Sequence, residues 1–450
     1  MSVSASKPCR RCMTSQEEYK TLFTERLFTL RNMETHLNHV EAVCTPDLQV
    51  QARNFGRQFY GVNGSSPLLE INGFDVTKCL VQDIMHLLSE GCLEVETRVF
   101  LKWCINNGAF ALDDFNEKIF LFDFGHLSKN KPSTILSAHL DNTLRQSASQ
   151  MACLSYVLPF IIMDLVQDDI EGTEIHHRLM CHNLLLQVSN ICFAYEVTDN
   201  HAYFLQGLIE MFLRNFTALY PGVIVPKFHF LLHVPKQIIQ FGPLRQQWCM
   251  RFEAVHAWFK SLARVVRSVK NIPWSLAYRY ESLRCVQLNS APGIQPTCFL
   301  YSGDLISEGV NIPFRNLEQP FEDVLIPLLL DVDVNECIVM STPKVIVHGT
   351  QYLHGSVVLL TCNEDDMPVF GKITNIYVHN RVIFFIILPY ETVTFSQSLN
   401  AYRIRVDVGA QPNAIALKDL IYPHHLSIFH CKGAKYVILL NHTRTEFLEV

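Results

Sequence analysis

Apolar residues recur at steps of three and four through most of the central chain, and this spacing is typical of amphipathic helices. The stretches with this period lack turn clusters and strand-like alternation, so we predict a helical region with short connections. Pro273 is expected at or near the start of a helix. The helical stretches are 139–165, 173–195, 200–219, 226–240 and 243–289.

The pattern changes in the last third of the chain. From about residue 346, short segments rich in β-branched and aromatic residues alternate with turn residues, which predicts a small barrel or curled sheet. We therefore expect an α+β multidomain protein with four parts. These are an N-terminal segment 1–70, a mainly helical region 71–290, a connector 291–345 and a β-rich, barrel-like module 346–450.

Composition narrows the class of protein. The 450 residues carry a net charge of −6, so nucleic-acid binding would need a local basic patch. Fifteen cysteines at irregular spacing, with no apolar signal core at the N-terminus, favour reduced thiols in the nucleus or cytoplasm over secretion. The most membrane-like stretch, 151–166, is short and contains Asp164, so we expect a buried helix and no transmembrane segment or membrane partner.

Two short motifs near the N-terminus contain zinc-ligating residue types. Cys9 and Cys12 form a CxxC unit, and His36 and His39 form an HxxH unit on an expected helix. Two thiolates and two imidazoles can bind zinc tetrahedrally. The intervening sequence is longer than a finger loop, so free thiols and surface histidines are the alternative interpretation.

A basic stripe marks the helix expected after Gly242-Pro243. Glu253 stands alone as an acid at its head, and basic residues follow on the same helical face. Such a face can lie along a phosphate backbone, whereas the simpler interpretation is a solvated charged surface. The candidate DNA-binding residues are Lys260, Arg264, Arg267 and Lys270.

Several motifs follow one another in a fixed order: an acid-x-x-His unit, a long helical stretch, paired histidines, Gly-Pro, and Phe-Glu on a helix. The residues of these motifs are Asp83, His86, His229, His233, Gly242, Pro243, Phe252 and Glu253. With this order of motifs, the chain resembles the C-terminal, catalytic half of CACTA (En/Spm)-type cut-and-paste DNA transposases over roughly residues 9–12 and 60–450.

The resemblance implies an RNase H-like core, with residues 87–225 matching its all-α insertion and Glu253 its late catalytic glutamate. In such enzymes, two divalent ions are held by two early aspartates and that glutamate. The histidine placement also resembles the V(D)J recombinase core, where ligands flanking the insertion bind structural zinc. This implies a zinc site made of Asp83, His86, His229 and His233, although Asp83 also fits a helix N-cap.

The chain departs from the family pattern at the early aspartates. Asp47 lies in a polar loop and Asp75 is only eight residues before Asp83, so neither fits the expected pair. We therefore expect an N-terminally truncated, catalytically inactive transposase relative with a vestigial Glu253 and retained DNA binding. Magnesium is expected only in an active full-length form.

Two other functions remain open from the sequence. The chain can be a fragment of an active metal-dependent transposase or nuclease whose aspartates are encoded upstream. It can also be an interaction scaffold, in which the β-rich module 346–450 binds a peptide or chromatin partner.

Overall fold

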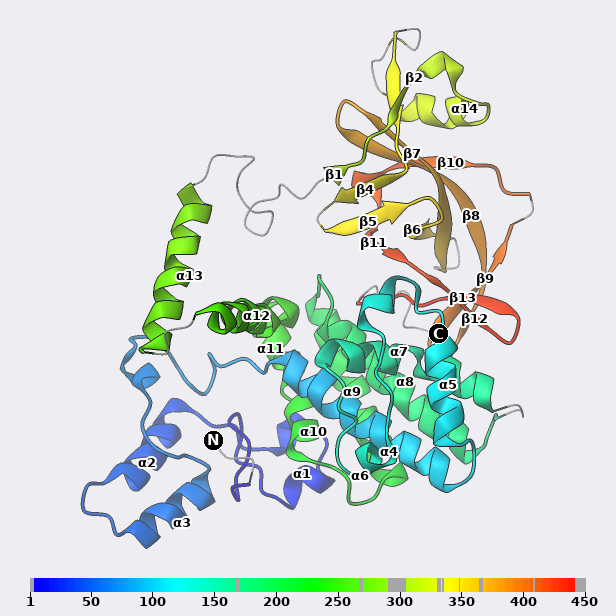
Figure 1. The fold of residues 1–450 in the computed structure, drawn as a ribbon. Helices are drawn as coiled ribbons and strands as arrows, with labels where there is room; N and C mark the ends of the chain where they lie inside the picture. Colours follow the sequence, from blue (N-terminus) through cyan, green and yellow to red (C-terminus); the bar gives the residue numbers. More distant parts are fainter. Residues whose placement is uncertain are drawn as a thin grey trace.

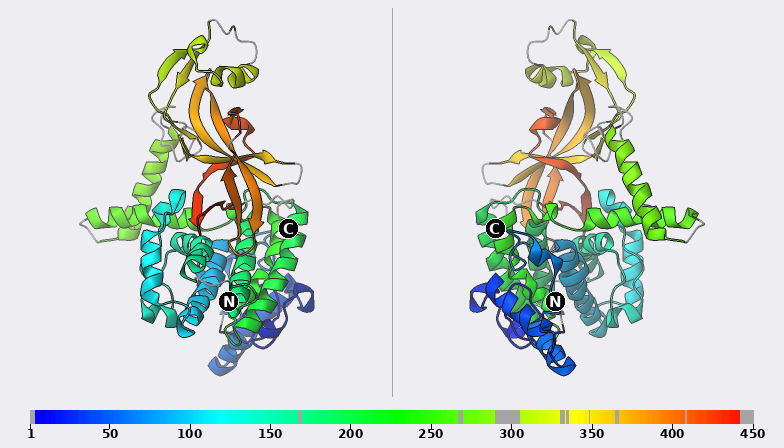
Figure 2. Two further views of the ribbon diagram at one scale, coloured as in Figure 1. Left: turned by 90° about the vertical axis from the view of Figure 1, so that its right-hand side faces the viewer. Right: turned by 90° about the vertical axis from the view of Figure 1, so that its left-hand side faces the viewer.

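The computed structural model describes residues 4–441 except 167–169, 267–269, 290–304, 330–332, 334–335, 348, 364–366 and 408. It consists of a helical body with a β unit seated above it (Figures 1 and 2). The helices of the body and its N-terminal part are α1 (Glu18–Thr21), α2 (Met33–Cys44), α3 (Val50–Tyr60), a π-helix (Met85–Cys92), α4 (Leu93–Asn106), α5 (Leu112–Leu121), α6 (Ser137–Asp141), α7 (Ala148–Leu165), α8 (Glu174–Cys192), α9 (Asp199–Leu219), α10 (Pro226–Leu231), α11 (Val234–Phe241), α12 (Met250–Val265) and α13 (Ile272–Asn289).

The long helices of the body begin at hydroxyl-bearing N-caps. Ser147, Thr173 and Thr198 precede α7, α8 and α9, and each side chain accepts a hydrogen bond from a backbone N–H of the first turn. Apolar positions then bury one face of α9, and more than half of the residues of α7 and of α8 are buried. The starts of α8 and α9 agree closely with the predicted stretches 173–195 and 200–219. The predicted stretch 139–165 is interrupted instead, because α6 ends at Asp141 and α7 begins only at Ala148.

Helix α7 lies at the centre of the body. It is long and apolar enough to cross a membrane by length and composition, but 67% of it is buried inside the fold. Phe160 on α7 packs against Phe429 of the β unit at 5.6 Å between ring centroids. Helix α7 is therefore a core helix here, in agreement with the sequence prediction.

The N-terminal part does not form a separate domain. Cys9 and Cys12 lie in the same hydrophobic cluster as the core of the body, while α2 and α3 form a small satellite core around Val40, Val43 and Val62. The predicted boundary at residue 70 therefore divides a continuous structure, because residues 5–31 pack directly on the helices.

The β unit is an antiparallel sheet with a three-stranded companion. Its sheet order is β11-β6-β7-β8-β9-β13-β12, with β10 and β3 joined to β8 and β7, and β2 joined to β3; the smaller sheet is β1-β4-β5. The strands and the helix among them are β1 (Leu305–Ile306), β2 (Val310–Pro313), α14 (Phe321–Leu325), β3 (Ile338–Ser341), β4 (Lys344–Val347), β5 (Thr350–Leu353), β6 (Val357–Cys362), β7 (Pro368–His379), β8 (Val382–Ser396), β9 (Ala401–Val406), β10 (Asn413–Ala416), β11 (Tyr422–Leu426), β12 (Ile428–Cys431) and β13 (Ala434–Val437).

The β unit starts earlier than the sequence indicated. Segments β1 to β4 lie within the predicted connector 291–345 or cross its end, and β3 pairs with β7 of the main sheet. These strands are only two to four residues long, and β2 contains Pro313 while β4 follows Pro343, so their alternation is too short to recognise. A turn at Asn380 and Arg381, both in the left-handed region, joins β7 to β8.

The body and the β unit meet through specific polar contacts. Asn183 on α8 donates hydrogen bonds to the carbonyls of Gln397 and Ser398 at 2.6 and 3.0 Å. Gly125 has a left-handed φ of 50°, and a Cβ there would lie 2.3 Å from Ser427 Oγ. Only glycine allows the body to approach β unit residue Ser427 this closely.

Helices α12 and α13 form an arm that projects from the body (Figure 2). The described side chains of α12 are all partly or fully exposed, including Phe252 at 77%. Trp258 and Phe259 pack on Tyr280 of α13. The apolar side chains of α12 therefore either pack on the second helix of the arm or face solvent, and none of those described is buried in a core.

All the strands in the described parts of the chain lie after residue 304, apart from a single bridge between Cys12 and Leu30. The mainly helical character of 71–289 and the β-rich C-terminal region are confirmed. The structure gives no support for an RNase H-like sheet, because the described residues before Leu305 contribute helices and loops only.

Candidate metal centres

A buried group of two cysteines and two histidines lies where the N-terminal segment meets the helical body. Cys9, Cys12, His229 and His233 are each at most 1% exposed, and their ligand atoms all lie within 4.8 Å of one another. Cys9 Sγ is 3.3 Å from His233 Nε2, and Cys12 Sγ is 3.1 Å from His229 Nε2. The two Nε2 atoms are 3.3 Å apart.

These separations match the edges of a tetrahedral zinc site. Zn–N bonds of about 2.1 Å and Zn–S bonds of about 2.3 Å place neighbouring ligand atoms about 3.3–3.8 Å apart. Two sulfurs and two imidazole nitrogens are the donor set of many closed structural zinc sites. The residues present therefore fit zinc, with no further ligand required.

The CxxC loop is held by backbone contacts and one buried arginine. The backbone N–H of Arg11 donates to Cys9 Sγ at 3.3 Å. Arg31 Nε donates to the carbonyls of Cys9 and Cys12 at 2.9 and 3.2 Å, and Cys12 pairs with Leu30 in an antiparallel bridge. The loop therefore presents both sulfurs toward the histidines before any metal binds.

The histidines are positioned by α10 and by a buried carboxylate. His229 lies on α10, which begins at Pro226, and His233 follows its end. His233 Nδ1 lies 2.7 Å from Glu25 Oε1. Donation from Nδ1–H to Glu25 leaves Nε2 as the ring nitrogen that faces the cysteines, and such a carboxylate–histidine pair is typical around bound zinc.

The charges of the group also favour a bound dication. Burial opposes ionisation of Cys9, but hydrogen bonding from Cys12 and the charge of His233 outweigh it and lower the pKa of Cys9 well below its usual value. Contact with Cys9 and burial raise the pKa of the Cys12 thiol. One dication with two thiolates is neutral overall, which removes the uncompensated charge from the interior.

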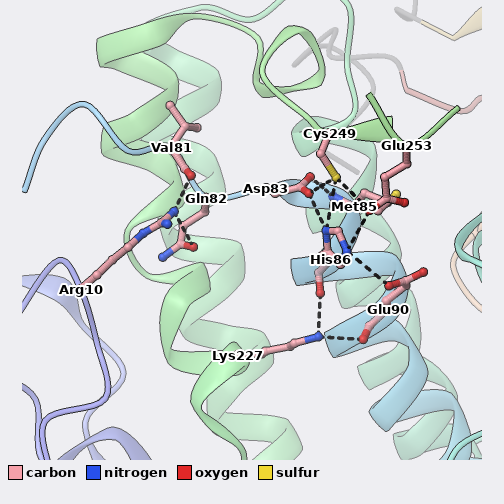
Figure 3. Close-up of polar contacts among 10 residues, drawn as sticks. All are labelled: Arg10, Val81, Gln82, Asp83, Met85, His86, Glu90, Lys227, Cys249 and Glu253. Carbon is pink, nitrogen blue, oxygen red and sulfur yellow. Dashed lines mark hydrogen bonds and ion pairs between the residues drawn. The ribbon is translucent and has the colours of Figure 1, made fainter. Parts of the chain in front are cut away.

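A second group of ligand-type side chains lies at the start of the π-helix (Figure 3). Asp83, His86 and Cys249 have ligand atoms within 4.8 Å of one another and are half-buried. Asp83 Oδ2 lies 2.6 Å from His86 Nδ1 and 2.6 Å from Cys249 Sγ. Asp83 Oδ1 accepts the backbone N–H of Met85, so the N-cap interpretation of Asp83 is supported as well.

The protonation of this group follows from its contacts. Burial opposes ionisation of Asp83, but hydrogen bonds from Cys249 and His86 lower its pKa. Burial and the Asp83 carboxylate raise the pKa of the Cys249 thiol to about 12. Without a metal, Cys249 is therefore a thiol that donates to Asp83.

The structure combines the predicted ligands differently from either sequence prediction. Cys9 and Cys12 lie with His229 and His233 rather than with His36 and His39, and His39 instead stacks on Tyr60 at 4.2 Å. The regrouping follows from the packing of the CxxC loop on α10.

The second predicted set is divided in the same way. Asp83 and His86 lie together, but they meet Cys249 rather than His229 and His233. Hydrogen bonds connect the segments that carry the two groups: Arg10, next to Cys9, donates to the Val81 carbonyl and to Gln82 Oε1 beside Asp83 (Figure 3).

Cys249 was not recognised in the sequence as a ligand candidate. It precedes Glu253 by one helical turn, so both side chains share a face of the helix. A cysteine at this spacing from a singled-out glutamate is the signal that could have identified it.

The remaining predicted site residues lie on the arm. The Glu253 side chain is 47% exposed, with Oε1 3.3 Å from His86 Nε2. Lys260, Arg264 and Lys270 are exposed, whereas Arg267 lies outside the described residues.

Comparisons with known proteins give no relative from which a function can be transferred. No protein-family profile, curated protein or solved structure matches the chain. The function must therefore be argued from the residues and their geometry.

Proposed function

We propose that this chain is a transposase-derived protein that binds DNA through the α12–α13 arm and has no strand-transfer activity of its own. The observation that carries the proposal is the arm itself, which is basic and exposed. Residues 250–289 contain seven lysines and arginines and two glutamates, although the whole chain has a net charge of −6. A local cationic surface on an acidic protein fits a polyanionic ligand.

The arrangement around Glu253 supports the transposase origin. His86 of the Asp-x-x-His unit lies 3.3 Å from Glu253 Oε1, although 167 residues separate them along the chain. The helical body occupies that interval. The resemblance requires these motifs to meet at one place, with the insertion between them.

We propose that the chain lacks catalysis because it lacks the two early aspartates that would bind the metal ions together with Glu253. Two-metal phosphoryl transfer needs several carboxylates that clamp both ions. The early pair of the resembled enzymes is carried by strands, and the described part of this chain has no strand of that kind before Leu305. The buried Cys2His2 group would hold a structural zinc that joins α10 to the N-terminal segment.

The experiment compares duplex DNA binding by the purified chain at two salt concentrations. The double variant Lys260→Ala with Arg264→Ala removes two exposed cations, so the salt slope should fall by about 2. The matched control is Arg315→Ala with Lys418→Ala, which removes two exposed cations from the β unit. Absence of binding at low salt, or equal weakening by both double variants, would refute the proposal.

A further inference from the structure

We infer that Asp83, His86 and Cys249 form a second metal site, accessible to solvent, that takes one divalent ion of the zinc type. The site lies at the junction of the π-helix and α12 and is distinct from the buried Cys2His2 group (Figure 3). This inference does not depend on DNA binding by the arm, because it is argued from the positions of the donor atoms alone.

Three donor atoms converge from two distant segments. Cys249 Sγ lies 3.4 Å from His86 Nδ1, which equals a tetrahedral edge of about 3.3–3.8 Å for zinc. Asp83 Oδ2 lies 2.6 Å from both of these atoms, within the space that one ion would occupy. To bind the same ion, Asp83 Oδ2 would move from 2.6 Å to about 3.3–3.8 Å from each of these two atoms.

The atoms behind the donors are also supported. Asp83 Oδ1 accepts from Met85 N at 3.1 Å, which leaves Oδ2 for the ion. His86 Nε2 faces Glu253 Oε1 at 3.3 Å and Glu90 Oε2 at 3.7 Å, so a carboxylate can accept Nε2–H while Nδ1 ligates. Hydrogen-bonded ligands of this kind are usual around protein-bound metals.

The π-helix places His86 for this role. Its wider turn leaves backbone carbonyls without partners in the usual ladder. Lys227 on α10 donates to the carbonyls of His86 and Glu90, each at 2.9 Å. A Cβ on Gly91 would lie 2.7 Å from the Lys227 side chain, so the helix is fixed against α10 at the site.

The donor set selects the class of ion. One thiolate, one imidazole and one carboxylate suit zinc or cobalt(II), whereas magnesium and calcium prefer oxygen ligands alone. Three protein ligands leave a fourth position for water. The His86 side chain is 46% exposed, so this position is open to solvent and the ion is exchangeable.

An ion here would tie the arm to the body. Cys249 immediately precedes α12, whose described side chains are not buried. Asp83 and His86 belong to the body, so one ion would join the base of α12 to the start of the π-helix.

Cobalt(II) is the probe that tests the site. The full chain is washed with a weak chelator, which removes ions from an open site, and then titrated with cobalt under reducing conditions. We expect uptake of about one cobalt per chain, with a sulfur-to-metal charge-transfer band. The variants Cys249→Ser and Asp83→Asn should both lose this cobalt, and asparagine keeps the cap to Met85. The control is Cys285→Ser, an exposed cysteine on α13.

Each outcome decides the inference. Loss of the cobalt in both ligand variants, with the control unchanged and the thermal denaturation curves superimposed, supports it. No cobalt uptake by the unaltered chain, or equal uptake and an equal spectrum in Cys249→Ser, overturns it.

Discussion

The two metal-type groups use similar side chains in opposite surroundings. Cys9, Cys12, His229 and His233 are buried, whereas Asp83, His86 and Cys249 lie near the surface. The buried group offers four ligands and no open position, and the exposed group offers three. The difference teaches that burial and ligand number would divide two roles: a metal held by the first group would stabilise the fold, and one held by the second would exchange with solvent.

Removal of a buried ligand should have the largest effect. Cys9→Ser leaves three ligands in a dry interior, so we expect loss of the bound zinc and a fall of about 3–5 kcal/mol in the free energy of unfolding. Metal analysis and urea denaturation measure both. The exposed Cys44→Ser is the control. If the Cys9→Ser protein kept its zinc, Cys9 would not be a required ligand, and the proposed difference between the two groups would be wrong.

His126 lies outside both metal-type groups, so its titration tests the effect of burial on stability without any contribution from a metal. Burial, with nearby His425 and His424, lowers the pKa of His126 to about 4, and Ser427 Oγ lies 2.7 Å from its Nδ1. As the pH falls below 6.5, the unfolded chain protonates His126 before the folded chain does, so the neutral histidine contributes its full stability only above that pH. That stability is lost as the pH falls toward 4.

We therefore expect the unaltered chain to lose about 1–2 kcal/mol between pH 7 and pH 5 through His126. His126→Asn should show a smaller loss in thermal denaturation over the same range, and chelation of zinc should leave the difference between the two proteins in place. Equal pH dependence in the two proteins would contradict the assigned role of His126.

The carboxylates behind the histidines should give the smallest effect. Glu25→Gln keeps the shape but removes the charge next to His233, so zinc affinity should fall by about tenfold, or about 1.4 kcal/mol. Glu253→Gln beside His86 should weaken cobalt binding at the exposed group by less, because solvent also satisfies His86 Nε2. Competition with a chromophoric chelator measures both. A larger loss of metal affinity in Glu253→Gln than in Glu25→Gln would contradict the expected difference between the buried and the exposed group.

Much of the fold could be predicted from the sequence. Helices α8 and α9 lie within a few residues of the stretches 173–195 and 200–219, because their apolar periodicity is long and their hydroxyl caps are clear. Strands β6 to β9 and β13 follow from β-branched and aromatic runs. Strands β1 and β2 were missed because two to four residues carry almost no alternation.

The metal groups show a different limit. The four residues of the buried group were all singled out, but in two different sets. Spacing along the chain grouped Cys9 and Cys12 with His36 and His39, whereas the resemblance grouped His229 and His233 with Asp83 and His86. The packing of the N-terminal loop on α10 decides the pairing, and residue spacing carries no information about contacts between segments more than 200 residues apart. The sequence likewise indicated which face of α12 is apolar without indicating that this face stays outside the core.

The buried group also bears on the order of events during synthesis. Cys9 and His233 are 224 residues apart, and Cys12 and His229 are 217 apart. At ordinary translation rates the cysteines leave the ribosome on the order of 10–40 s before their partners exist. The four side chains therefore meet only after the helical body has been made, and a zinc ion held by all four would report that the N-terminal part of the chain, up to His233, has folded together.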